Sequence, residues 1–141
     1  MHLIETSEAN FIDNYKNDIY IFIELSEKFF YEYLYQVDFM KPDTILPTIL
    51  FGQFGEIITK NIIDFEYHIN KKLFLHIEDM LNRDDEFLST IVVTGLLEGI
   101  TSSIYSQNIE GKIIEFSGQK TKKYIKDLEV ILPETTETPP R

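Results

Sequence analysis

The sequence predicts an all-α protein: a single-domain helical bundle of six or seven helices over residues 1–132, followed by a flexible C-terminal tail, 133–141. Apolar residues recur at intervals of three and four along most of the chain, which is the period of an amphipathic helix. The 141 residues include only six Gly and five Pro, and most of these stand where helices are expected to begin or end. Hydrophobic residues make up 43% of the chain, which is enough to bury one core.

The first two helices are expected at about 7–15 and 18–38. The second has the clearest amphipathic pattern in the sequence. Its apolar face comprises Ile19, Phe22, Ile23, Phe29, Phe30, Tyr33 and Val37. Its opposite face comprises Tyr20, Glu24, Glu27, Tyr31, Tyr35 and Asp38. Such a division predicts that one side is buried and that the other is exposed.

The third helix is expected to open after Pro42, with Asp43 or Thr44 as its cap, and to reach about Ile63. Pro47 is tolerated because it lies in the first turn, where no intrahelical bond is lost. The apolar positions of this helix are Leu46, Ile49, Leu50, Phe54, Ile57 and Ile58. A fourth helix, about 65–82, carries Ile69, Leu73, Phe74, Ile77, Met80 and Leu81.

The polar break Asn-Arg-Asp-Asp-Glu at 82–86 supplies Asp84 or Asp85 as the cap of a fifth helix, about 86–105. The β-branched run 91–93 favours a strand locally, but the apolar spacing over twenty residues favours a helix. That spacing is set by Leu88, Ile91, Val92, Leu96, Ile100 and Ile104. Two more helices, about 109–116 and 120–132, are expected on either side of Ser117-Gly118.

Four of the six glycines lie inside predicted helices, Gly52 and Gly55 in the third and Gly95 and Gly99 in the fifth. Each costs about 1 kcal/mol relative to Ala in a helix interior. We expect a compensating close contact, in which the fifth helix packs on the third over bare backbone. The alternative is a ligand notch at the same place.

Charge favours a basic partner. Thirteen Lys and Arg against 24 Asp and Glu give a net charge of -11, which repels nucleic acids and anionic membranes. Five lysines between 112 and 126 form a local basic end, which we interpret as charge balance within the fold. The absence of Cys, of a recognisable targeting segment and of an apolar run as long as a membrane span predicts a cytoplasmic protein.

Catalytic patterns are weak, so we expect no enzyme, no metal and no cofactor. His68 and His76 are eight residues apart, which separates them by roughly 12 Å on a straight helix. That distance is too long for one metal ion, and we interpret both as partly exposed helix residues. No zinc-protease, nucleophile-elbow or phosphate-loop motif is present.

The stronger candidates are surfaces for a protein partner. Tyrosine interleaved with carboxylates is typical of interface centres that bind basic proteins. The predicted contact residues on the second helix are Tyr20, Glu24, Glu27, Tyr31 and Tyr35. A second acidic patch is predicted at Asp84, Asp85 and Glu86, for which helix capping is the structural alternative.

Three segments, 45–58, 73–100 and 115–129, resemble a family of small helical bacterial proteins, largely uncharacterised. Many of them are immunity proteins of polymorphic or contact-dependent toxin systems. The resemblance rests on core and turn positions such as Leu46-Pro47, the acidic break and the lone Gly118. The resemblance implies that the chain binds a cognate toxin that is basic, for example a nuclease. It does not indicate which residues of this chain are catalytic or bind the toxin.

Two other function classes remain open at this point. One is an acidic helical adaptor or regulatory protein that binds a basic protein without any toxin. The other is a metal-dependent or carboxylate hydrolase, which the ligand spacing disfavours. The oligomeric state is left open by the sequence.

Overall fold

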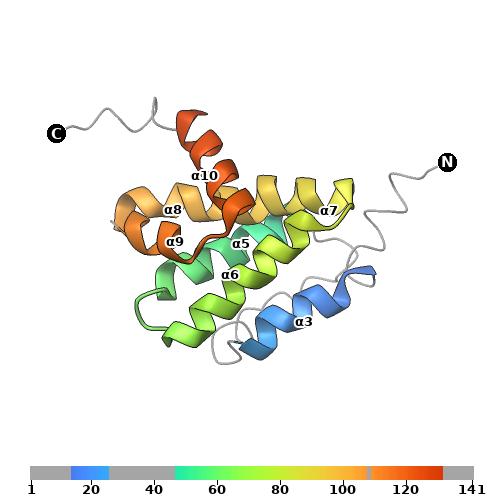
Figure 1. Ribbon diagram of the computed structural model, residues 1–141, viewed down its shortest axis with the longest axis horizontal. Coiled ribbons are helices and arrows are strands. Elements are labelled where there is room, and N and C mark those ends of the chain that lie inside the picture. Colours follow the sequence, from blue (N-terminus) through green and yellow to red (C-terminus); the bar gives the residue numbers. More distant parts are fainter. Residues whose placement is uncertain (1–13, 26–46, 108, 132–141) are drawn as a thin grey trace.

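The computed structural model describes residues 14–25, 47–107 and 109–131, and these ranges contain helices joined by short turns and loops, with no strand. The all-α prediction is therefore confirmed. Its helices are α3 (Lys16–Leu25), α5 (Pro47–Asn61), α6 (Tyr67–Asn82), α7 (Glu86–Ile91), η2 (Val92–Leu97), α8 (Glu98–Gln107), α9 (Glu110–Phe116) and α10 (Gln119–Ile131). Because α7, η2 and α8 are continuous, the described ranges contain six helical segments that pack together (Figure 1).

The predicted helices agree with these bounds to within a few residues wherever the structure describes them. The predicted helix at 7–15 except its last two residues, the part of the second helix beyond Leu25 and the predicted tail lie outside the described residues. Asp85 is the observed cap of α7, since its Oδ1 accepts the Leu88 amide at 3.0 Å. Pro47 stands in the first turn of α5, as expected.

The predicted helix 86–105 contains a π-helical segment that the periodicity does not show. Across η2 the backbone bonds span five residues, and the Glu98 amide donates to the carbonyls of Val93 and Gly95. The apolar stripe nevertheless stays on the inner side of the continuous α7–η2–α8 rod. Its buried members with described side chains are Leu88, Ile91, Val92, Leu96 and Ile100.

Aromatic and aliphatic side chains from α3, α5, α6 and the α7–η2–α8 rod form one core. In Figure 1, α6 crosses the centre of the molecule, with α3 on one side and the rod on the other. Phe22 of α3 lies 5.0 Å from Phe54 and 6.1 Å from Phe51, measured between ring centroids. One prediction for α5 is wrong: Ile49 is 50% exposed, because α5 turns the neighbouring Leu50 and Phe51 inward.

The contact between α5 and the rod is made over bare glycine backbone, which confirms the predicted packing. A methyl group added at Gly55 would overlap the Leu96 carbonyl oxygen, and one at Gly99 would overlap the carbonyl oxygen of Gly52. At Gly95 it would lie 2.9 Å from the Thr48 carbonyl oxygen. Only hydrogen side chains allow the two helices to approach this closely.

Glu78 of α6 fixes the start of α10. Its carboxylate accepts the backbone amides of Lys120 (2.9 Å) and Thr121 (3.0 Å) and the Thr121 hydroxyl (2.8 Å). Burial opposes ionisation of Glu78, but these hydrogen bonds outweigh it and hold the pKa of the carboxyl below its usual value. A carboxylate from another helix thus supplies the cap that the Ser117-Gly118 break requires.

None of the helices in the described ranges combines the length and the apolar character that crossing a membrane requires.

Candidate protein interface

The outer side of α3 carries the described part of the predicted tyrosine and carboxylate surface. Tyr20 is 51% exposed, and Glu24 is exposed one helical turn further on. Because residues four apart share a face of a helix, the two side chains form one strip. The remaining predicted members, Glu27, Tyr31 and Tyr35, lie outside the described residues.

The inner side of α3 is held by an ionic cluster that the sequence did not reveal. Asp18 is buried, and its two carboxylate oxygens accept from Arg83 Nη1 at 3.0 Å and Nη2 at 2.6 Å. Arg83 Nη2 also donates to Asp79 Oδ2 at 2.9 Å. A bidentate pair of this kind fixes both distance and orientation, so it sets the rotation of α3 about its axis.

His76 completes the cluster and corrects the expectation of two partly exposed histidines. His68 is exposed, but His76 is only 7% exposed and packs edge-on against Phe22 at 5.1 Å between ring centroids. Its Nε2 lies 3.2 Å from the Asp18 carbonyl oxygen, which can only accept, so the neutral ring carries its proton on Nε2.

Burial decides the protonation of His76. Desolvation lowers its pKa and outweighs the nearby Asp18, while the Arg83 charge acts in the same direction as burial. Hydrogen bonding to Asp18, opposed by desolvation, raises the pKa of the Arg83 guanidinium. The cluster therefore contains a neutral imidazole beside a fixed carboxylate–guanidinium pair. Through Asp18 the cluster joins α3 to α6 and to Arg83 at the end of α6.

Tyr15 joins the start of α3 to the acidic break before α7. Its hydroxyl donates to Asp85 Oδ2 at 2.8 Å, and its ring stacks on Phe87 at 6.3 Å between centroids. Burial, together with the Asp85 carboxylate, raises the pKa of Tyr15 to about 12. The structure thus brings the beginning of α3 next to the second predicted patch.

The three acids of that patch have different roles. Asp85 uses one oxygen to cap α7 and the other to accept from Tyr15, so it is structural. Asp84 and Glu86 are exposed, and neither forms an ion pair with another residue in the described ranges. The capping alternative therefore accounts for Asp85, and Asp84 and Glu86 remain available to a partner.

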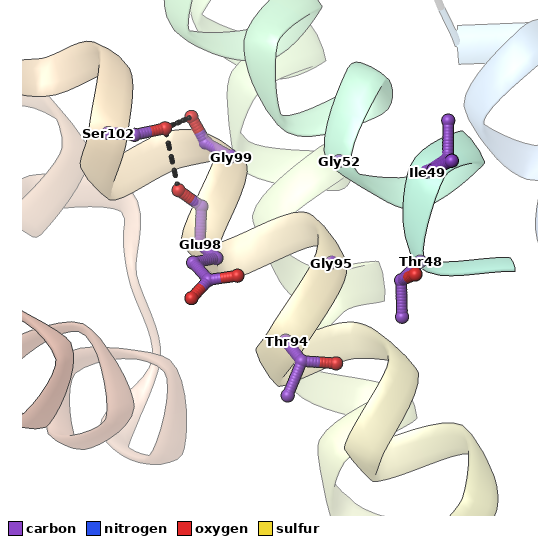
Figure 2. A pocket seen from close by; sticks show the side chains of 8 residues that line it. All are labelled: Thr48, Ile49, Gly52, Thr94, Gly95, Glu98, Gly99 and Ser102. Carbon is purple, nitrogen blue, oxygen red and sulfur yellow. Dashed lines mark hydrogen bonds between the residues drawn. The ribbon is translucent and has the colours of Figure 1, made fainter. Parts of the chain in front are cut away.

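A shallow groove of about 400 Å³ lies above the glycine contact, at the place of the alternative ligand notch. Figure 2 shows its floor of Gly52, Gly95 and Gly99 between α5 and the rod. Ser102 turns its hydroxyl back to the Glu98 and Gly99 carbonyls, at 2.9 and 3.3 Å. Of the described residues that line this groove, Glu98 is the only ionisable one, and they contain no acid–base pair.

A carboxyl pair between α9 and α10 is the other unusual electrostatic feature. Glu129 Oε2 is buried and faces no hydrogen-bond donor in the described part of the chain. Burial, followed by the neighbouring Glu110, raises the pKa of Glu129 to about 7 against the opposing charge of Lys126. The carboxyl is thus held partly protonated near neutral pH.

Among the side chains that the structure describes, no group of three or more His, Asp or Glu is arranged to hold a metal ion. The five lysines at 112, 120, 122, 123 and 126 are exposed. Lys123 pairs with Asp127 at 3.4 Å, one helical turn away, which accords with charge balance inside the fold at that position.

No protein-family model, no curated protein and no solved structure matches this chain. The resemblance of the three sequence segments to immunity proteins therefore stays a prediction.

Proposed function

We propose that this chain is a cytoplasmic immunity protein of a polymorphic or contact-dependent toxin system, which binds and neutralises a cognate basic toxin domain. It does so by contact alone and catalyses no reaction. The observation that supports this most directly is the two-sided character of α3. Tyr20 and Glu24 are exposed on one side, while Phe22, Asp18 and Arg83 fix the other.

A surface on a fixed helix is suited to tight binding because little order has to be gained on association. Tyrosine adds a large contact area at a low cost in side-chain entropy. The net charge of -11 attracts a basic partner over a long range and raises the association rate. These three properties together describe an inhibitor that must find and hold a toxin quickly.

Genetic neighbourhood supplies the first experiment. The open reading frame adjacent to this gene is expressed with and without this chain, and growth is measured. Rescue of growth by this chain supports the proposal. Binding to a basic protein that is harmless to the cell would instead support the acidic adaptor.

Interface variants test the surface itself. The double variant Tyr20→Ala/Glu24→Lys should weaken toxin binding by tenfold or more, because it removes an anchor and reverses a steering charge. Glu56→Lys is the matched control, since Glu56 is exposed on α5. Surface plasmon resonance at several salt concentrations should show an association rate that falls as salt rises. Equal toxin binding by both variants would show that α3 is not part of the interface.

A further inference from the structure

A surface hollow of about 320 Å³ lies between the α7–η2 part of the rod and α10, at the acidic break. It is distinct from α3 and from the glycine groove. It is lined by Glu86, Ser89, Thr90, Val93, Thr94 and Tyr124. The five residues of the rod recur at spacings of three and four, so they share one face, and Tyr124 of α10 completes the lining.

Glu86 gives this hollow an uncompensated negative charge. The side chain is exposed and takes part in no ion pair within the described ranges. The nearest lysine in sequence to Tyr124 is Lys123, whose Nζ lies 5.8 Å from the ring centroid and pairs with Asp127. The ring therefore already attracts one cation of the chain itself, with which an arginine would compete, whereas the Glu86 carboxylate pairs with no cation in the described ranges.

The chemistry of the lining fits a guanidinium group better than an ammonium group. A planar guanidinium forms two parallel hydrogen bonds to a carboxylate and stacks on an aromatic ring. The hydroxyls of Ser89 and Thr90 can accept its remaining N–H groups, and Val93 offers an apolar surface to the methylene stem. Lysine is a strongly hydrated point charge and uses neither the planar nor the bidentate geometry.

We infer that the hollow between Glu86 and Tyr124 binds an arginine side chain of a basic protein partner. The identification of the toxin as that partner rests on the proposed function. The binding of arginine does not, because it follows from the hollow, the uncompensated carboxylate and the ring. In the complex, the site would act as a second anchor beside the α3 surface.

The experiment is a ¹H–¹⁵N NMR titration of the full chain with Nα-acetyl-arginine methylamide at low ionic strength. The lysine and citrulline analogues are titrated in parallel. We expect saturable shifts at the amides of 86–94 and at the Tyr124 ring for the arginine compound. Citrulline, which has the shape without the charge, should produce none of them.

Variants assign the contacts. Glu86→Gln should weaken arginine binding about fivefold, because it removes the charge-assisted pair. Tyr124→Leu should weaken it about threefold, whereas Tyr124→Phe, which keeps the ring, should not. Glu98→Gln, an exposed carboxylate on the same rod, is the control and should bind as the original chain does. The spectrum of each variant shows whether it is folded.

Shifts that do not saturate, or that spread over all exposed carboxylates, would overturn the inference, as would an equal response to lysine. The two proposals can fail separately. If arginine binds here but the chain rescues no toxin-expressing cell, the immunity function fails alone. If the toxin binds and Glu86→Gln and Tyr124→Leu leave its dissociation rate unchanged, the arginine site in the complex fails alone.

Discussion

The contact of α5 with the rod is made by backbone atoms, whereas the contact of α3 with α6 is made by polar and charged side chains. Gly55, Gly95 and Gly99 bring α5 and the rod together through bare backbone. Between α3 and α6, the buried Asp18 binds Arg83 and His76 across the interface. The first contact depends on the absence of side chains, and the second depends on their charge.

The difference indicates how each contact responds to change. A backbone contact has no room to adjust, so it is intolerant of added volume and indifferent to pH. An ionic contact tolerates small shifts of position but depends on the protonation and pairing of every member. Since α3 carries Tyr20 and Glu24, the proposed binding surface depends on the contact that is sensitive to charge.

The largest expected effect is that of a methyl group in the glycine contact. Gly55→Ala should lower the free energy of unfolding by about 3 kcal/mol, because the new Cβ overlaps the Leu96 carbonyl and the backbones must separate. Urea denaturation followed by circular dichroism measures the change.

Gly52→Ala is the matched control in the same helix. Its Cβ would lie 3.6 Å from the Gly95 carbonyl oxygen, an ordinary contact, so the variant should gain up to about 1 kcal/mol from helix propensity. Equal stability of Gly55→Ala and Gly52→Ala would show that the backbones of α5 and the rod do not approach each other so closely at Gly55.

The second effect concerns the ionic contact. Asp18→Asn, which nearly keeps the shape of the side chain, should lower the free energy of unfolding by about 2 kcal/mol, because Arg83 loses its buried charged acceptor. Asp79→Asn, which changes the exposed partner of Arg83, should cost much less. A similar loss in both variants would contradict the central place of Asp18.

The third effect is a dependence of the unfolding free energy on pH, which is expected for the ionic contact and not for the glycine contact. Because burial lowers the pKa of His76, the unfolded chain binds a proton there more readily than the folded chain does. The stabilisation by neutral His76 is therefore complete above about pH 6.5 and is lost as the pH falls through the lowered value.

The measurement compares His76→Gln with the original chain between pH 7.5 and 5 by urea denaturation. The difference in unfolding free energy should shrink as the pH falls, and a difference that stays constant over this range would contradict the burial of a neutral His76. The two chains are best compared in a Glu129→Gln background. Glu129 has a raised pKa of about 7, so its stabilising effect is present at low pH and lost as the pH rises, the opposite trend.

The smallest effect is expected at the edge of the ionic contact. Tyr15→Phe removes the hydrogen bond to Asp85 and keeps the ring on Phe87, so it should cost about 1 kcal/mol. Tyr15→Leu, which also loses the stacking, should cost more. No difference between the Phe variant and the original chain would mean that water replaces the hydroxyl contact.

The helices in the described ranges, apart from the π-helical geometry of η2, and the glycine contact could be predicted from the sequence alone. Periodicity, caps and breakers act over a few residues, so α6, a cap at Asp84 or Asp85 and the end of α9 at Ser117-Gly118 followed from local patterns, and the structure selects Asp85. Glycines inside two helices lower the helix propensity of both. This cost required compensation, which predicted that the two helices contact each other.

Which polar residues are structural and which are available depends on the tertiary structure. Asp18 and Arg83 look like ordinary polar residues near helix ends, and His76 like one in a helix interior; nothing local shows that residues 58 and 65 positions apart meet. Likewise, the structure alone showed that both carboxylate oxygens of Asp85 accept hydrogen bonds, while Glu86 and Tyr124 line the same hollow. Pairing of charges depends on three-dimensional distance and burial, and the order of residues along the chain fixes neither.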